Sequence, residues 1–188
     1  MCGIVGIYNF DKSKTVQQAH LKAMADHMEH RGPDDHGYHI SENVGIGMRR
    51  LSIIDLGGGH QPIYTQDKKK VIVFIGEVYN YGDHRPDLEK IGHKFDTHSD
   101  TEVVLHLYEQ YGIDFLEKLN GMFGLAIWNE DEKELVIARD RIGIKPVYYY
   151  RDGEKIIFAS EIKSILALPF IKAELDLHGL GTFLKYGF

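Results

Sequence analysis

The chain has 188 residues, of which 43% are hydrophobic, and it carries a formal net charge of −6 and a single cysteine. This apolar content argues against a disordered chain and predicts one substantial globular core, with room for the start of a second domain. The acidic balance argues against nucleic-acid and membrane partners, since the longest basic run is residues 68–70. A lone cysteine forms no internal disulfide, and we see no leader or long apolar stretch, so we expect a cytoplasmic location.

The first third of the chain predicts a strand followed by a helix. Residues 3–8 form the apolar run GIVGIY, which is typical of a buried strand. Thr15 and Gln18 have the spacing of a capping box, and we expect them to open a helix that ends near residues 30–33, where glycine and proline interrupt it. The apolar face of this helix consists of Leu21, Met24, Ala25 and Met28.

The middle of the chain predicts a second strand and a second helix. Residues 71–75, VIVFI, form a continuous β-rich run, so we expect this strand to be covered on both faces. Ser99 and Glu102 repeat the capping-box spacing, and Gly112 stands where the helix they open should end. The glycines at 57–59 lack the lysine and hydroxyl residue of a phosphate loop, so we expect a flexible turn there.

The last third predicts two hairpins and two helices. Residues 123–129 and 134–140 flank a polar turn, and residues 147–150 and 155–160 flank another, so antiparallel pairing is expected. A short helix is expected at 161–167. Residues 174–188 have the pattern of a helix that continues past the last residue. Several antiparallel strands with a few helices indicate a layered α+β fold, with sheets inside and helices outside.

The only cysteine stands at position 2, directly behind the start methionine. A cysteine elsewhere is most often a small buried apolar residue. Here, removal of Met1 would put a thiol nucleophile and a free α-amine on one residue, and α-amines titrate at about 7.7–8.0, close enough to neutral to accept the thiol proton. A retained Met1 would leave the protein inactive. The eleven histidines show no H-x-x-H motif and no pairing with cysteine, so we expect neither a catalytic triad nor a metal site.

Seven blocks of sequence stand out in order along the chain. They are MCGIVGIYNF at the start, HRGPDDHG (30–37), RRLSIIDLGGGHQP (49–62), GEVYNY (76–81), HSDTEV (98–103), NGMFGLAIW (120–128) and ARDRIGIKPVYY (138–149). Together they resemble the glutaminase half of glutamine-dependent asparagine synthetases, from residue 2 to about residue 166. The RLSIID and GEVYNY motifs favour this branch over sugar-phosphate and phosphoribosyl amidotransferases.

The resemblance implies a class II glutamine amidotransferase domain. Its fold would be an N-terminal-nucleophile hydrolase-like, four-layer α+β sandwich of two stacked antiparallel sheets flanked by helices. The domain would span residues 2–170, and residues 171–188 would begin the linker or first helix of a C-terminal, ATP-dependent synthetase domain. ATP and Mg²⁺ would belong to that domain, and this one would hold no cofactor and no metal. L-Glutamine and the synthetase domain are the implied partners, and a homodimer is compatible with the resemblance.

The resemblance also assigns roles to residues. Cys2 would attack the side-chain amide of glutamine and form a γ-glutamyl thioester, Arg50 would hold the α-carboxylate, and Asp100 would bind the α-ammonium. The other implied contacts are with Leu51, Ser52, Ile53, Ile54, Ile75, Gly76 and Glu77, with the Gly76 N–H as a catalytic donor. The residues alone leave alternatives open, because Arg50 could be a surface ion-pair partner, Asp100 a helix-start residue and Gly76 a bulge.

One position departs from the family pattern. The usual block reads N-G-E-[IV]-Y-N, and its asparagine amide and glycine N–H form the oxyanion hole, but this chain has Ile75 in place of the asparagine. Loss of one such donor lowers kcat by about 10²–10³-fold. Two functions therefore stay open. The domain is either a glutaminase that feeds ammonia to a synthetase domain, with aspartate as the implied acceptor, or a glutamine-binding or docking domain with little hydrolysis.

Overall fold

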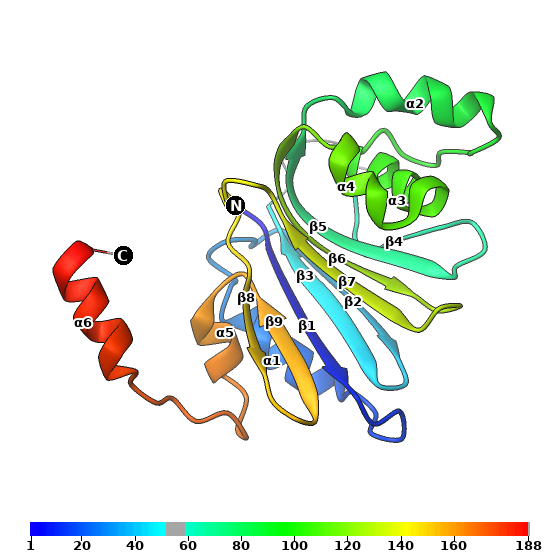
Figure 1. Ribbon diagram of the computed structural model, residues 1–188. Helices are drawn as coiled ribbons and strands as arrows, with labels where there is room; N and C mark the ends of the chain where they lie inside the picture. The colour runs from blue at the N-terminus through cyan, green and yellow to red at the C-terminus, as the bar shows by residue number, and fades with distance from the viewer. Residues whose placement is uncertain (52–58, 188) are drawn as a thin grey trace.

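The computed structural model describes residues 1–51 and 59–187, which form two stacked antiparallel sheets with helices on their outer faces (Figure 1). The first sheet has the strand order β2-β3-β1-β9-β8, and the second has the order β4-β5-β6-β7. The strands are β1 (Gly3–Asn9), β2 (Asp35–Ser41), β3 (Val44–Arg50), β4 (Ile63–Tyr64), β5 (Lys70–Val78), β6 (Gly121–Asn129), β7 (Glu134–Arg139), β8 (Tyr148–Arg151) and β9 (Lys155–Ala159).

Helices α1 and α5 pack on the first sheet, whereas α3 packs on the second and carries α2 beside it. A 3-10 turn, η1, leads from α3 into the short helix α4, and α6 stands apart from both sheets (Figure 1). The bounds are α1 (Gln18–Asp26), α2 (Tyr81–Lys90), α3 (Asp100–Tyr111), η1 (Gly112–Asp114), α4 (Phe115–Lys118), α5 (Ile162–Leu166) and α6 (Leu177–Tyr186).

Three apolar layers hold these elements together because side chains alternate along the central strands. In β5, Val71, Val73 and Ile75 point between the sheets, whereas Ile72 and Phe74 pack on the side of α2 and α3. A third cluster joins β1 and β9 to α1 and α5. The expected four-layer α+β sandwich is confirmed, and so is the coverage of residues 71–75 on both faces.

The structure confirms most of the predicted elements. The strand at 3–8, both hairpins, the short helix at 161–167 and the helix that ends at Gly112 all form. Strands β2 and β3 and helix α2 were not predicted. The two strands mix glycine and charged residues among their apolar ones, and α2 contains Gly82 and Pro86, which are poor helix formers.

The predicted start of α1 and the predicted end of α6 are wrong. The N-cap of α1 is Gln17, which makes no side-chain bond, so Thr15 does not cap this helix. Its buried face nevertheless contains Leu21, Met24 and Ala25, as expected. α6 does not continue through the last residue, because it ends at Tyr186 and Gly187 takes a left-handed conformation with φ of 80°.

The predicted capping box of α3 is half right. Ser99 is the N-cap, and its Oγ accepts a hydrogen bond from the Thr101 N–H (3.1 Å). Glu102 accepts instead from the N–H groups of Asp96 (2.8 Å) and Thr97 (2.7 Å), outside the helix. Glu102 therefore orders the segment that leads into α3.

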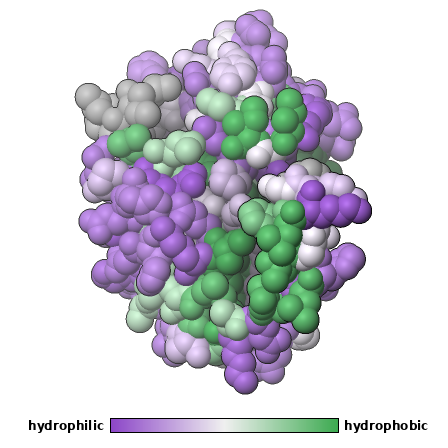
Figure 2. All heavy atoms as spheres, turned by 90° about the vertical axis from the view of Figure 1, so that its left-hand side faces the viewer, coloured by the Kyte–Doolittle hydropathy of each residue, from purple (hydrophilic) through white to green (hydrophobic). Residues whose placement is uncertain are grey.

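One face of the molecule carries a patch of hydrophobic side chains beside a hydrophilic area (Figure 2). Figure 2 shows hydrophobic side chains gathered on the face seen from the left of Figure 1. Exposed members include Ile162 and Leu166 near α5, and Leu177, Phe183 and Leu184 on α6. Among the described residues, no helix has both the length and the apolar character that crossing a bilayer requires.

Candidate active site

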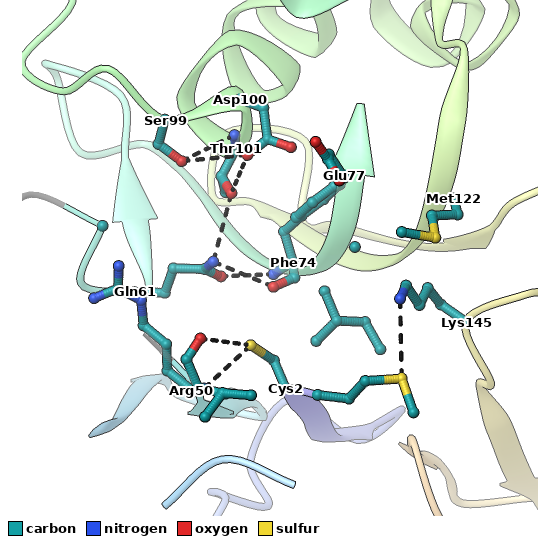
Figure 3. A pocket seen from close by; sticks show the side chains of 15 residues that line it. Cys2, Arg50, Gln61, Phe74, Glu77, Ser99, Asp100, Thr101, Met122 and Lys145 are labelled. Atoms are coloured by element: carbon teal, nitrogen blue, oxygen red, sulfur yellow. Dashed lines mark hydrogen bonds between the residues drawn. The ribbon is translucent and has the colours of Figure 1, made fainter. Parts of the chain in front are cut away.

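A cavity of about 200 Å³ lies where the start of β1 and the ends of β3 and β5 come together (Figure 3). Cys2, Arg50 and Asp100 all line it, although they are far apart in the sequence. The other lining residues are Met1, Leu51, Gly59, Gln61, Phe74, Ile75, Gly76, Glu77, Ser99, Thr101, Met122 and Lys145. The fold therefore brings the three principal predicted site residues to one cavity.

Cys2 stands just before β1, with its thiol half-buried at the cavity wall. The Leu51 N–H donates to Cys2 Sγ at 3.3 Å, and the Leu51 carbonyl oxygen lies 3.7 Å from the same sulfur. Arg31 Nε donates to the Cys2 carbonyl oxygen at 3.0 Å, which fixes the backbone of the residue. The sulfur is thus held in one place by neighbours from two other segments.

Arg50 ends β3 and is only 7% exposed, so its side chain is not at the surface. Its backbone is fixed by pairing with Asp35 of β2 and by the Asp34 N–H, which donates to the Arg50 carbonyl oxygen at 3.1 Å. A guanidinium is planar and always charged, and its donors match a carboxylate in two-point geometry. At this wall it provides a site for an anionic group.

Asp100 is both the first residue of α3 and a cavity residue. Its Oδ2 accepts a hydrogen bond from the Val78 N–H at 2.9 Å, which ties the helix to the end of β5. Burial raises the pKa of the Asp100 carboxyl above its ordinary value and the charge of Glu77 adds to the rise, while hydrogen bonds from the Val78 and Thr101 N–H groups oppose it. A cationic group in the cavity would offset that rise.

Ile75 and Gly76 form the β5 wall. Ile75 is 2% exposed and packs in the apolar layer between the sheets, against which Cys2 also packs. Its side chain offers no hydrogen-bond donor. Gly76 has φ of 129°, and a Cβ there would collide with the Met122 carbonyl oxygen, so the position requires glycine. The pairing of β5 with β6 runs without interruption through Gly76, so Gly76 is not a bulge.

Gln61 forms a wall that the sequence did not predict. Its side-chain amide acts as a short strand: the Phe74 N–H donates to Gln61 Oε1 (2.7 Å), and Gln61 Nε2 donates to the Phe74 carbonyl oxygen (3.2 Å). Gln61 Nε2 also lies 3.5 Å from Thr101 Oγ1, which connects β5 to α3. Gln61 and Thr101 stand inside the recognised blocks, but nothing in the blocks reveals which side chains pair with backbone.

Lys145 and Met1 close one side of the cavity, with Lys145 Nζ 3.9 Å from Met1 Sδ (Figure 3). Leu51 and Glu77 line the cavity as the resemblance implied. Ser52, Ile53 and Ile54 lie outside the described residues, as do two of the three glycines expected to form a turn. Their predicted contacts and the predicted turn remain predictions.

A family comparison agrees with this geometry. A model described as the glutamine amidotransferase domain matches residues 1–188. The chain belongs to this glutamine amidotransferase domain family. Its curated relatives include two proteins of Bacillus subtilis named Asparagine synthetase [glutamine-hydrolyzing] 2 and 1, which are 44% and 43% identical over 171 and 190 residues. These alignments cover 90% and 100% of this amidotransferase chain.

The amidotransferase chain spans only a small part of those relatives, 23% of the first and 30% of the second. A plant relative, Asparagine synthetase [glutamine-hydrolyzing] of Zea mays, is 37% identical over 167 residues, which is 88% of this chain and 28% of that protein. The recognised resemblance to the glutaminase part of such proteins is therefore confirmed.

Solved structures confirm the fold of the amidotransferase domain. The glutamine phosphoribosylpyrophosphate amidotransferase of Bacillus subtilis superposes with a TM-score of 0.72 at 21% identity, covering 88% of this chain and 43% of that one. A structure described as the allosteric regulatory enzyme of purine biosynthesis superposes with a TM-score of 0.74 at 22% identity, with the same coverage. The N-terminal-nucleophile hydrolase-like sandwich expected from the resemblance is thus the observed fold.

Proposed function

We propose that this domain hydrolyses L-glutamine to glutamate and ammonia, with Cys2 as nucleophile and with Arg50 and Asp100 as the groups that hold the amino acid. The observation that carries the proposal is the convergence of these three side chains on one cavity. Free glutamine has an anionic α-carboxylate, a cationic α-ammonium and a neutral amide. The cavity has a buried cation, a half-buried carboxyl and a thiol to match them.

Glutamine recognition would depend on two charge-assisted contacts. Arg50 would donate two parallel hydrogen bonds to the α-carboxylate, and Asp100 would accept hydrogen bonds from the α-ammonium. The ammonium would also hold the Asp100 carboxyl in its ionised form, against the rise in pKa that burial causes. With its charged end fixed in this way, the side-chain amide would extend toward Cys2.

The reaction would proceed in two steps. Cys2 Sγ attacks the amide carbon and the oxygen takes the negative charge, after which the nitrogen leaves as ammonia with a proton delivered by the Cys2 α-amine. Water then attacks the thioester carbon, the carbon–sulfur bond breaks, and glutamate leaves with the thiol restored. Both steps require that Met1 has been removed, because only then does Cys2 carry a free amine.

Ile75 limits the rate of both steps. The Gly76 N–H would stabilise the oxyanion, but the side chain at position 75 adds no second donor. From the loss of one such donor elsewhere, we expect a kcat about 10²–10³-fold below that of an enzyme with asparagine here. Glutamine binding would be less affected, since an oxyanion donor acts mainly in the transition state.

The second candidate function follows from the same residue. If the domain binds glutamine but hydrolyses little of it, its role is recognition or docking, and the buried aliphatic side chain of Ile75 is the observation that favours this reading. Both functions share the binding site. They differ in the rate of ammonia release.

Ammonia release from glutamine by the Met1-free domain tests the proposal. We expect slow release that Cys2→Ala abolishes and Ile75→Asn accelerates, with Ile75→Leu as a matched control that restores no donor. A glutamine Kd and a Tm for each variant separate loss of folding from loss of catalysis. If folded Ile75→Asn binds glutamine and shows no faster release, Ile75 does not occupy the oxyanion position. If the unaltered domain binds glutamine without Cys2-dependent release, the recognition function replaces the enzymatic one.

We further propose that the ammonia serves a C-terminal, ATP- and Mg²⁺-dependent synthetase domain, with aspartate as acceptor. This proposal is supported by the names of the relatives and by the quarter to a third of their length that this chain spans. Residues 171–188 would then begin the connection between the domains. The exposed apolar face near α5 and α6 is a suitable contact surface for that domain (Figure 2). Glutamine-dependent asparagine formation by the full-length protein, absent in its Cys2→Ala variant, is the expected result.

A further inference from the structure

Three side chains with metal-binding atoms converge beside α3. His93 comes from the segment between α2 and α3, and His106 and Glu109 lie one turn apart on α3 itself. His93 Nδ1 is 3.0 Å from His106 Nδ1, His106 Nδ1 is 3.2 Å from Glu109 Oε2, and His93 Nδ1 is 3.4 Å from that same oxygen. The three atoms thus form a nearly equilateral triangle.

The size of this triangle matches a zinc site. A tetrahedral zinc ion binds imidazole nitrogen and carboxylate oxygen at about 2.0–2.2 Å, which places neighbouring ligand atoms about 3.3 Å apart. All three observed separations lie close to this value. An ion slightly above the plane of the triangle would therefore bind all three atoms without rearrangement of the side chains.

The outer contact of the His93 ring indicates where its proton lies. His93 Nε2 faces Gln110 Oε1 at 3.3 Å, and His106 Nε2 lies 3.9 Å from Glu102 Oε1. Gln110 Oε1 is an acceptor within hydrogen-bond reach of His93 Nε2, which favours the His93 tautomer with its proton on Nε2 and a lone pair on Nδ1; the Glu102 contact is too long for a hydrogen bond. Histidines that bind metals commonly place their second N–H against such an acceptor, which orients the ring and raises its basicity.

The surroundings favour a cation at the point between His93 Nδ1, His106 Nδ1 and Glu109 Oε2. The two Nδ1 atoms and Glu109 Oε2 face one another at hydrogen-bond distance, so a cation bound to all three would replace the proton that otherwise joins them. His106 is 4% exposed, so bulk water does not screen these groups well. Lys70 Nζ lies 3.7 Å from Glu109 Oε1, whereas the other carboxylate oxygen, Oε2, faces the two histidine Nδ1 atoms.

We infer that His93 Nδ1, His106 Nδ1 and Glu109 Oε2 bind one zinc ion, with a water molecule as the fourth ligand. A cavity of about 200 Å³ adjoins the three residues and gives the water room; its other lining residues are Gln66, Asp67, Gly92 and Lys94. It shares no lining residue with the cavity that contains Cys2. The ion would fasten the segment before α3 onto the helix that carries Asp100, about 9 Å along its axis from His106.

Zinc titration of the 188-residue chain tests this inference. The Cys2→Ala variant is the proper background, because a thiol beside a free α-amine binds zinc by itself. We expect one zinc ion per chain by calorimetry, with a Kd in the micromolar range or tighter, and a Tm that rises with zinc concentration. Co²⁺ in place of zinc should give the visible absorption of a four-coordinate ion.

Two substitutions in this background locate the ion, and a third controls for charge. Glu109→Gln should weaken binding by at least about 100-fold, since it removes a direct ligand, and Gln110→Leu should weaken it by about 10-fold through ring orientation. Glu117→Gln removes an exposed carboxylate of α4 and should leave the Kd unchanged. Absence of one-to-one binding in the Cys2→Ala protein would overturn the inference, and so would equal affinity in Glu109→Gln and Glu117→Gln.

Discussion

Asp100 is the carboxyl that would bind the α-ammonium of glutamine under the proposed function, and its ionisation depends on its surroundings. Its burial and the charge of Glu77 raise its pKa, so the folded chain holds the proton more tightly than the unfolded chain does. The stability this group contributes is therefore present at low pH and is lost as the pH rises from the ordinary value through the raised one. The proposed binding of glutamine requires the opposite state, because the ammonium would bind the ionised carboxylate.

Asp100→Asn should change both the binding of glutamine and the pH dependence of stability. The KM for glutamine should rise about 10- to 100-fold, from the loss of about 1.5–3 kcal/mol of charge-assisted hydrogen bonding. In the unaltered domain KM should increase as the pH falls through the raised pKa of Asp100, and the variant should lack this acidic limb. KM measured from pH 4 to 8 checks this, with Glu117→Gln as the control that keeps the limb.

The same variant should unfold at higher denaturant concentration than the unaltered domain at pH 7, without glutamine. The difference should shrink toward pH 3.5, where the native carboxyl is already protonated. An acidic limb that persists in Asp100→Asn would show that another group controls glutamine binding.

The principal site residues could be predicted from the sequence because the family blocks contain them in order. Cys2, Arg50, Gly76 and Asp100 all line the cavity. The role of Gln61 could not be predicted, because a side chain that replaces a backbone strand leaves no pattern of spacing. The cluster around His93 and His106 was also missed, since these residues stand thirteen positions apart in different segments and only the path of the chain brings them together.

At the level of secondary structure, the edge of β5 shows how one side chain completes a sheet. β4 pairs with β5 only at Ile72 and Val71. At Phe74 the side-chain amide of Gln61 makes the two backbone hydrogen bonds that a neighbouring strand would otherwise make. Gln61 is 7% exposed, so solvent does not substitute readily for its two hydrogen bonds.

Gln61→Leu should therefore lower the free energy of unfolding by about 2–6 kcal/mol, because two backbone groups of Phe74 lose their partner at roughly 1–3 kcal/mol each. Urea denaturation gives the value. Gln66→Leu makes the same chemical change at an exposed neighbouring position and should cost less than about 0.5 kcal/mol. Equal costs in the two variants would mean that water or another side chain replaces the amide of Gln61.

The elements themselves were predictable where periodicity was strong and not where it was weak. The run at 71–75 and both hairpins follow from apolar patterning and turn residues. The capping-box pattern identified Ser99 correctly and Thr15 wrongly, since any hydroxyl residue three before a glutamine fits it. Helix α2 forms despite Gly82 and Pro86, and its single buried residue, Leu88, packs on the cluster beneath α3.

At the scale of the whole molecule, the four layers form a complete unit that does not depend on α6. No residue of α6 is buried, whereas Ile165 and Leu168 near α5 belong to the core cluster around α1. Ile171 packs against that cluster from the rim. Leu168 and Ile171 thus connect the segment after α5 to this core, and the domain boundary at residue 170 stays a prediction.

Removal of residues 175–188 should shift Tm by no more than about 2 °C, since it exposes no core surface. Removal of residues 161–188 should prevent folding, because Ile165 and Leu168 are lost from the core. Thermal unfolding followed by circular dichroism distinguishes the two truncations. A large drop in Tm for the shorter deletion would mean that α6 packs on the domain in solution.

The position of Met1 next to Cys2 links the proposed activity to the processing of the N-terminus. Met1 lines the cavity beside Cys2, and while it is attached the α-amine belongs to Met1 and not to the residue that carries the thiol. Under the proposed mechanism, activity requires removal of Met1 by an aminopeptidase, so the amount of active protein would depend on this cleavage as well as on translation. In rapidly expressed batches, intact-mass spectrometry should detect the chain with Met1 and the chain without it. Specific activity should rise in proportion to the fraction of chains that lack Met1.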